Sequence, residues 1–264
     1  METRISGWRI ALGIVVTVIL LFLLLPSLIT AVISFGSSNQ IVFPPKGFSL
    51  TLFRRFFSEE GWVSSTWLSF RVAIWSTLLA LMLGIPAAYA LTRGRFPGRK
   101  ILALFLLSPV MVPHVAVALA LYMYFTEIGL SNGELRLVFA HAIATLPFVV
   151  VTASAGLRHI DPALERAATV MGASRLTVLR RVTLPLLTPS IIASGLFAFL
   201  ISFDEVVISW FVARAGDTTL PIKMFSSIQF EVSPVLAAIS TMLTALSIVI
   251  CVIVATVQKE ARSG

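Results

Sequence analysis

Long runs without charged residues alternate with short charged segments along this chain. Six runs lack Asp, Glu, Lys and Arg, and each is at least 21 residues long. About 20 apolar residues in a helix cross the hydrocarbon core of a membrane. The pattern therefore predicts an all-α membrane protein with six transmembrane helices, at residues 10–34, 72–92, 101–126, 137–157, 182–203 and 235–257. No repeat or low-complexity segment divides the chain, so one membrane domain over residues 1–264 is expected.

The third run carries two prolines near its middle, in the sequence LSPVMVPHV. Pro109 and Pro113 are both expected to break the helix there, because proline removes a backbone donor and clashes with the preceding turn. Broken helices are tolerated at membrane depth only where the freed backbone groups face protein or a water-lined cavity. The third span is thus a candidate for lining a transport pathway.

Composition agrees with a membrane protein, because 58% of residues are hydrophobic and only 12% are charged. The net charge of +8 could suggest nucleic-acid binding, but the basic residues gather at the ends of the spans. With the N-terminus inside, 13 of the 20 Lys and Arg residues lie in the cytoplasm. This positive-inside bias predicts a multi-pass protein with both termini cytoplasmic, and it explains the charge without nucleic acid.

The sequence offers no catalytic or metal-binding constellation. His114, His141 and His159 lack the spacing of a metal-binding helix pair, and an interhelical hydrogen bond is the expected role of the first two. The lone Cys251 excludes an intrachain disulfide. No Gly-x-x-x-x-Gly-Lys-Ser/Thr loop is present, so any ATP and Mg²⁺ must be bound by another subunit.

The segment 158–181 is polar, rich in arginine and placed between two apolar runs. Asp161 followed by Pro162 is a strong helix start, and Gly172 is a natural stop. Ser174 can cap a second short helix that begins near Arg175. Leu164, Ala167, Ala168 and Met171 fall on one face of the first helix. A helix with small residues on its apolar face suits close contact with a partner better than simple adsorption to lipid.

This segment resembles the cytoplasmic coupling loop of permease subunits of binding-protein-dependent ABC importers. The family pattern is Glu-Ala-Ala, three residues, Gly, nine residues, Ile, one residue, Leu-Pro. Its counterparts in this sequence are Arg166, Ala167, Ala168, Gly172, Val182, Leu184 and Pro185. Arg166 replaces the family's glutamate, and Glu165 stands one residue earlier, about 100° away around the helix.

The resemblance implies the MetI-like fold of type I ABC importer permeases, with a coupling helix in the cytoplasmic loop. It also implies a bacterial inner-membrane location, a second homologous permease subunit, a dimer of cytoplasmic ABC ATPases and a periplasmic substrate-binding protein. The residues expected to couple to the ATPase are Asp161, Glu165, Arg166, Ala167, Ala168, Gly172 and Pro185.

Two adjacent acids, Asp204 and Glu205, stand at the end of the fifth run. They could attract a cation at the outer mouth of the pathway, or they could cap a helix turn or pair with Arg214. The surrounding sequence resembles permeases that import polyamines such as spermidine and putrescine. The matching residues are Ser202, Phe203, Asp204, Glu205, Leu220, Pro221, Ser233 and Pro234. The expected pathway residues are Asp204, Glu205, Pro109 and Pro113.

Three alternatives remain beside a polyamine importer. Members of the same subfamily could carry another small organic solute, such as an amino-acid derivative or an opine. A self-powered secondary transporter would need ionisable groups deep within its spans, and the spans here are free of charge. An intramembrane enzyme would need a nucleophile with its base, or a metal cluster, and the sequence suggests neither.

Overall fold

A computed structural model describes residues 7–230 and 232–263, with side chains described for most positions up to Val249. All regular secondary structure within these ranges is helical, which confirms the all-α prediction. Several charges used in the topology argument, together with the lone cysteine, lie outside the described residues or side chains: Glu2, Arg4, Arg9, Glu231, Cys251, Lys259, Glu260 and Arg262.

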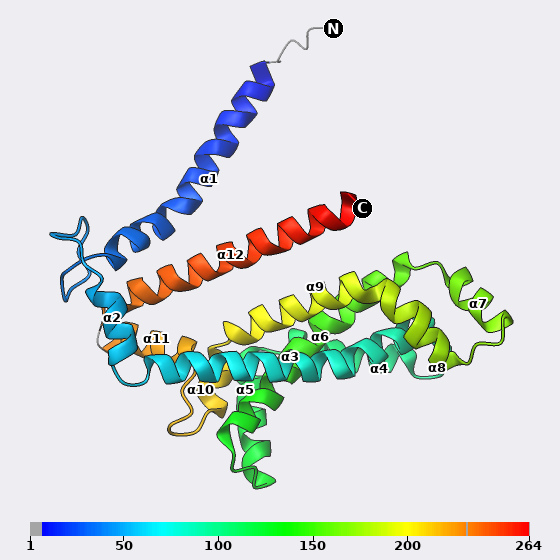
Figure 1. Cartoon of the computed structure of the whole chain (residues 1–264). Helices are drawn as coiled ribbons and strands as arrows, with labels where there is room; N and C mark the ends of the chain where they lie inside the picture. The colour runs from blue at the N-terminus through cyan, green and yellow to red at the C-terminus, as the bar shows by residue number, and fades with distance from the viewer. Residues whose placement is uncertain (1–6, 231, 264) are drawn as a thin grey trace. The chain divides into compact units, whose positions relative to one another are not determined.

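The chain forms two compact units. One unit combines residues 1–63 with residues 226–264 and contains α1 (Gly7–Ser34), α2 (Thr51–Ser58) and α12 (Val235–Ser263). Within this unit α12 packs against both α1 and α2 (Figure 1). Most of α1 is apolar and exposed, as expected for a helix that faces lipid.

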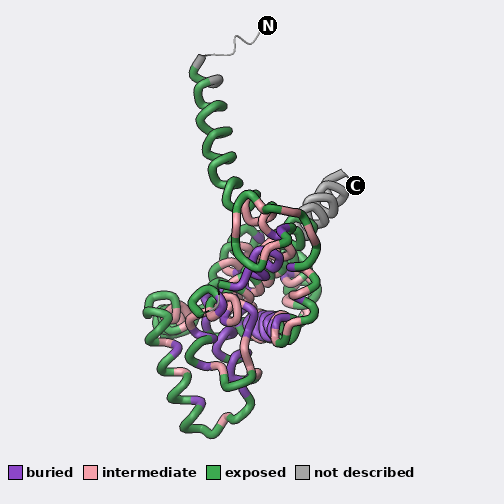
Figure 2. Tube along the Cα trace, turned by 90° about the vertical axis from the view of Figure 1, so that its left-hand side faces the viewer, coloured by how far each residue is buried: buried purple, intermediate pink, exposed green. Residues whose placement is uncertain are grey.

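The central unit covers residues 64–225 and holds the remaining helices. In chain order these are α3 (Trp62–Arg93), α4 (Arg99–Met111), α5 (His114–Glu127), α6 (Gly133–His159), α7 (Pro162–Val170), α8 (Arg175–Val178), the π-helix η1 (Leu179–Thr183), α9 (Leu184–Phe203), α10 (Val207–Val212) and α11 (Leu220–Phe230), of which α3 and α11 cross the boundary between the units. Buried positions gather where the long helices meet (Figure 2).

Small residues allow α3, α6 and α9 to approach closely. Ala80, Val149 and Ala198, one from each of these helices, form a cluster without solvent exposure. A Cβ on Gly84 of α3 would stand 2.6 Å from a methyl group of Val149 on α6, so the helices touch there through the glycine. Small residues at helix contacts are typical of membrane proteins, where packing replaces the hydrophobic driving force.

The predicted spans are only partly reproduced. Among the described residues, four continuous helical segments are long and apolar enough to cross a membrane: residues 11–34, 62–93, 133–159 and 175–203. The third predicted span is the pair α4 and α5, bent by 105°. The backbone of α12 covers the sixth predicted span, but its described side chains provide an apolar stretch only over Val235–Val249. Six spans therefore stay a prediction.

Only one of the two prolines breaks the third span, which corrects the expectation for Pro109. Pro109 lies inside α4, whereas Pro113 precedes α5 at the break. Pro109 cannot donate to the carbonyl of Phe105, but the hydroxyl of Ser108 donates to that oxygen at 2.8 Å. This substitute hydrogen bond satisfies the freed carbonyl, so α4 continues past Pro109.

Candidate functional site

The segment 158–181, predicted as the coupling loop, has the helix ends that its sequence predicts. The backbone N–H of Ala163 donates to Oδ1 of Asp161 at 2.8 Å, and Pro162 occupies the first turn of α7. Gly172, which follows α7, has a φ of +91°, a conformation that glycine adopts without strain. Ser174 accepts a hydrogen bond from the N–H of Thr177 and so caps α8. These contacts confirm both helix starts and the glycine stop.

One side of the loop is left open and apolar. Val170 and Met171 are 88% and 87% exposed, and Leu164 is 49% exposed. Ala167 is exposed and Ala168 is half-buried. The central unit thus presents, beyond the ends of its long helices, a surface with apolar side chains and a small residue at which another molecule can approach closely (Figure 1).

Glu165 faces the opposite way from this surface. Its Oε1 lies 3.4 Å from Nε of Arg93 and accepts a hydrogen bond from Thr183 at 3.1 Å. Its Oε2 accepts from the hydroxyl of Tyr89 at 3.4 Å. Arg166 is exposed. The Glu165 carboxylate therefore binds within the central unit, and the exposed residue between it and the Ala-Ala pair, Arg166, carries a guanidinium.

Arg93 joins this contact to the end of α6. Its Nη2 donates to the carbonyl oxygens of Leu157 and Ile160, at 2.9 and 2.6 Å. The Leu157 carbonyl also accepts the backbone N–H of Ile160 at 3.3 Å. Both carbonyls lie where α6 ends, so the cation interacts favourably with the helix dipole. We call Tyr89, Arg93, Glu165 and Thr183 the Glu165 joint. It connects α7 to α3, to the end of α6 and to η1.

The sequence named Glu165 as a residue that couples to the ATPase, and it predicted none of the contacts with Tyr89, Arg93 and Thr183. Arg93 ends the second charge-free run, and a cation at that place is a usable signal for contact with a neighbouring helix end. Thr183 belongs to η1, the π-helix before α9. A π-helix inside a longer helix is frequent at functional positions. Pro185 follows in the first turn of α9 and is exposed.

The acidic pair near the end of α9 separates into two environments. Glu205 is 8% exposed, and its Oε1 accepts the backbone N–H of Ile208 at 2.9 Å. This bond confirms that Glu205 caps the turn into α10. Asp204 follows α9 and is exposed. The pairing with Arg214 is wrong, because Arg214 donates to the carbonyl of Ser131 instead.

The broken third span meets Glu205 through a histidine. His114 begins α5 directly after Pro113, and its Nδ1 lies 3.5 Å from Oε2 of Glu205. His114 is half-exposed while Glu205 is nearly buried. Pro113 and Glu205, predicted separately as pathway residues, are thus brought to one place, whereas Pro109 lies within α4 on the other side of the break.

A buried network of polar side chains is centred on His141. His141 on α6 is 1% exposed, and its ring nitrogens lie 2.8 Å from Oγ of Ser202 and 2.7 Å from Oγ of Ser209. Ser202 also contacts Oγ of Ser76 on α3 at 2.9 Å. The network links α3, α6, α9 and α10, which confirms an interhelical hydrogen-bonding role for His141. Among the described residues, no group of three or more His, Cys, Asp or Glu side chains could hold a metal ion.

Relatives of this chain are membrane components of transport systems. PotC, the spermidine/putrescine transport system permease protein of Escherichia coli, is 32% identical over 260 residues, which is 97% of each chain. PotI, the putrescine transport system permease protein of the same species, is 34% identical over 245 residues, covering 90% of this chain and 86% of PotI. A putative 2-aminoethylphosphonate permease of Salmonella typhimurium, PhnV, is 31% identical over 222 residues, or 83% of each.

Solved structures agree on the fold. A bacterial ABC transporter involved in the import of the polysaccharide alginate superposes with a TM-score of 0.75, at 17% identity and with 98% of both chains covered. The relatives are transport components and not enzymes. Residues 80–260 match the family of inner membrane components of binding-protein-dependent transport systems. The chain therefore belongs to this family of multi-pass ABC importer permeases, and it is homologous to the polyamine permeases PotC and PotI.

Proposed function

We propose that this chain forms part of the translocation pathway of an ATP-driven polyamine importer, with spermidine or putrescine as cargo. The observation that carries the proposal is its identity of 32% and 34%, over most of its length, to two permeases named for these polyamines. The similarity to PotC covers 97% of this chain, whereas the family model matches residues 80–260, so the similarity extends beyond the part that defines the family.

The complete importer then contains a second homologous permease, a pair of cytoplasmic ATPases that bind ATP and Mg²⁺, and a periplasmic binding protein that delivers the cargo. This chain lies in the bacterial inner membrane with both termini in the cytoplasm. The distribution of Lys and Arg supports this orientation. The exposed apolar surface of α7 supports docking of an ATPase at the loop, because such a surface is unfavourable in water.

In this proposal the Glu165 joint carries movement from the ATPases to the membrane. When the ATPases close, they move α7. Because Glu165 on α7 holds Arg93 on α3 and Thr183 on η1, a displacement of α7 is passed to α3 and, through η1, to α9. Asp161 and Gly172 fix the two ends of the moving helix, and Pro185 lies where the motion enters α9.

The proposed cargo route passes the break in the third span. Asp204 and Glu205 supply negative potential there, and charges near a low-dielectric region act more strongly than exposed surface acids. Pro113 creates the break that brings His114 to Glu205, and Pro109 lies just before it in α4. A polycation can lose part of its water beside these carboxylates without binding so tightly that its release is prevented.

The proposal is tested with the whole importer, encoded with its ATPase, second permease and binding protein, in a strain that lacks its own polyamine uptake. Uptake of labelled spermidine and putrescine is compared with uptake of labelled 2-aminoethylphosphonate. Saturable, ATP-dependent polyamine uptake that needs the binding protein is expected. Uptake of only the phosphonate would contradict the polyamine assignment and leave the permease function intact.

A second candidate is the import of another small organic solute. The similarity to PhnV, at 31% identity, favours it, because the name of that relative specifies an amino-phosphonate, which carries both an ammonium and an anionic group. Glu205 could bind the ammonium of either cargo. Calorimetric titration of the binding protein with both compounds separates the two candidates, because that subunit captures the cargo first.

A further inference from the structure

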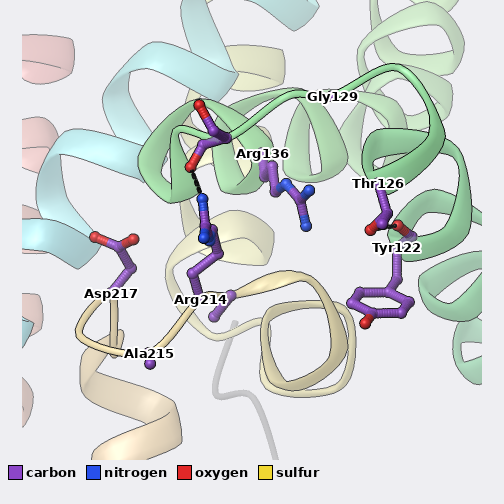
Figure 3. Close-up of a pocket in the computed structure, with 9 residues that line it drawn as sticks. Tyr122, Thr126, Gly129, Arg136, Arg214, Ala215 and Asp217 are labelled. Atoms are coloured by element: carbon purple, nitrogen blue, oxygen red, sulfur yellow. Dashed lines mark hydrogen bonds between the residues drawn. The ribbon is translucent and has the colours of Figure 1, made fainter.

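A cavity of about 610 Å³ lies at the end of the central unit that carries the N-terminus of α6 (Figure 3). Its walls come from the last turns of α5, the turn at residues 129–131, the start of α6 and the loop at residues 213–217. The polar side chains of the lining include Tyr122, Thr126, Arg136, Arg214 and Asp217.

Arg136 is the most buried charge of this cavity, at 7% exposure. Its Nε donates to the carbonyl of Leu130 and its Nη2 donates to that of Phe125 at 3.2 Å. A guanidinium has five N–H donors, and these bonds use two of them. Figure 3 shows the head of the side chain directed into the cavity. The backbone of α5 and the following turn therefore hold a cation in place with donors to spare.

Arg214 provides a second guanidinium from the loop that follows α10. It is exposed and donates to the carbonyl of Ser131 (Figure 3). Asp217 packs against the first turn of α6, where a Cβ on Gly133 would collide with its carboxylate. This acid lies at the positive end of the α6 dipole. Two arginines against one aspartate leave the cavity with a net positive charge, so it favours an anionic occupant.

The cavity and the coupling loop lie at opposite ends of α6. That helix runs from Gly133 at the cavity to His159, just before α7, and its 27 residues span about 40 Å. If α7 faces the cytoplasm, the cavity opens on the outer side of the membrane. Two arginines repel a polyamine, which is a cation, so the cavity is not part of the proposed pathway for the cargo.

We propose that this cavity receives a carboxylate side chain of the extracytoplasmic binding protein when that protein docks. The inference rests on the proposed function as an importer permease. Arginine forks bind carboxylates through two parallel hydrogen bonds, which fix orientation as well as adding affinity. A lipid headgroup fits less well, because the cavity lacks long apolar side chains for the acyl chain. A separate cavity of about 440 Å³, lined by Trp75, Leu78, Met82, Leu135 and Phe139, has that apolar character.

The test uses the complete importer, reconstituted in lipid with its ATPase and second permease, and titrated with the binding protein loaded with its own cargo. ATP hydrolysis is measured against binding-protein concentration for the unaltered chain, for Arg214→Gln and for Arg136→Lys. We expect each change to raise the half-saturating concentration about tenfold, the loss of one charge-assisted hydrogen bond. Hydrolysis without binding protein and the maximal stimulated rate should remain unchanged. The substitution at exposed Arg214 should not disturb folding.

Arg54→Gln is the matched control, because it removes one exposed arginine from a segment predicted on the same side. Equal half-saturating concentrations of binding protein for Arg214→Gln and Arg54→Gln would overturn the proposal. A defect whose size depends on the anionic lipid content would also overturn it and assign the cavity to lipid. Slower cargo uptake at an unchanged half-saturating concentration of binding protein would overturn it and assign the cavity to cargo. If binding protein fails to stimulate even the unaltered importer, the proposed function itself is wrong.

Discussion

Glu165 of α7 lies 3.4 Å from Arg93 of α3, and both side chains are largely enclosed, with 14% and 16% exposure. Arg93 in turn holds the carbonyl oxygens at the end of α6. One ion pair thus connects α7, the proposed coupling helix, to two long helices of the same unit. An exposed ion pair contributes little, but this pair is supported by hydrogen bonds from Thr183 and Tyr89, which restrict its geometry.

Glu165→Ala should therefore uncouple ATP hydrolysis from transport. Without the carboxylate, α7 loses its bonds to α3 and η1, and Arg93 keeps only the carbonyls of α6. A loss of about 1 kcal/mol in coupling corresponds to roughly fivefold less cargo moved for each ATP hydrolysed. The ratio is measured in proteoliposomes that contain the whole importer.

Arg166→Ala is the comparison for this change, because Arg166 lies on the exposed side of α7, where the ATPase is proposed to dock, and outside the Glu165 joint, so its loss can weaken docking but leaves the joint intact. Its ratio of transport to hydrolysis should stay close to normal if the joint carries the movement. An equal loss in both variants would point to general damage to α7. The double variant Glu165→Ala with Arg93→Ala should lose less than the sum of the single changes, as expected for residues in contact.

Gly172→Val should strain the turn that ends α7. The φ of +91° is unfavourable for a side chain, and the cost is about 1–2 kcal/mol for an ordinary residue and more for a β-branched one. No heavy atom lies within 4 Å of an added Cβ, so the effect comes from the backbone and not from a collision. The expected result is normal membrane insertion with lost transport and reduced recovery of ATPase on purification.

Gly98→Val provides the comparison, since Gly98 also has a positive φ, of +82°, and equally open surroundings. It precedes α4 and stands outside the coupling loop. Transport should survive in Gly98→Val and fail in Gly172→Val. Similar uptake in the two variants would remove the special role assigned to the end of α7.

The ends of α7 were predictable because their determinants are local. Asp161, Pro162 and Gly172 act on backbone groups within a few residues, so the sequence pattern contains the relevant interaction. Pro109 misled the prediction because its effect depends on the rotamer of Ser108, which decides whether the freed carbonyl is satisfied. The orientation of the Glu165 side chain could not be derived from the sequence, because its partners Tyr89 and Arg93 lie more than 70 residues away along the chain.

The cavity lined by Arg136 and Arg214 could not be predicted for the same reason, because it depends on contacts between distant parts of the chain. From the sequence, Arg214 was only a candidate partner of the acidic pair and Arg136 had no assigned role, although the fold places both around one cavity. Their proximity depends on how α5, α6 and the loop after α10 pack together. The buried network at His141 could be predicted only in part. A histidine inside an apolar span needs a hydrogen-bond partner, but its two serine partners belong to other helices and could not be identified from the sequence.

Topology is open to direct labelling. Ser174→Cys and Ser58→Cys are introduced separately into a chain in which Cys251 is replaced by Ser, and both positions are exposed. A membrane-impermeant maleimide should label position 58 in intact spheroplasts, and position 174 only after the membrane is opened. This result follows from the excess of Lys and Arg assigned to the cytoplasmic side. The reverse pattern would invert the orientation and place the arginine-lined cavity inside.

The acidic pair is best tested by separating the charge of Glu205 from its capping bond. Glu205→Gln keeps an oxygen that can accept the N–H of Ile208 but removes the negative charge. Combined with Asp204→Asn, it should slow the uptake of a polycation at least severalfold, because the cargo then meets no negative potential beside the break in the third span. The amount of assembled complex and its basal ATP hydrolysis should stay near normal.

Glu205→Ala removes the capping bond as well, at a cost of about 1 kcal/mol, so it should also reduce the amount of assembled complex. Glu127→Gln, at an exposed acid that ends α5, controls for the loss of one negative charge on the same predicted side. Uptake and complex yield are measured together for all variants. Normal uptake by a fully assembled Asp204→Asn, Glu205→Gln double variant would exclude the pair from the pathway. A loss of yield that parallels the loss of uptake would make Glu205 a structural residue only, since its hydrogen bond to α10 would then explain both results.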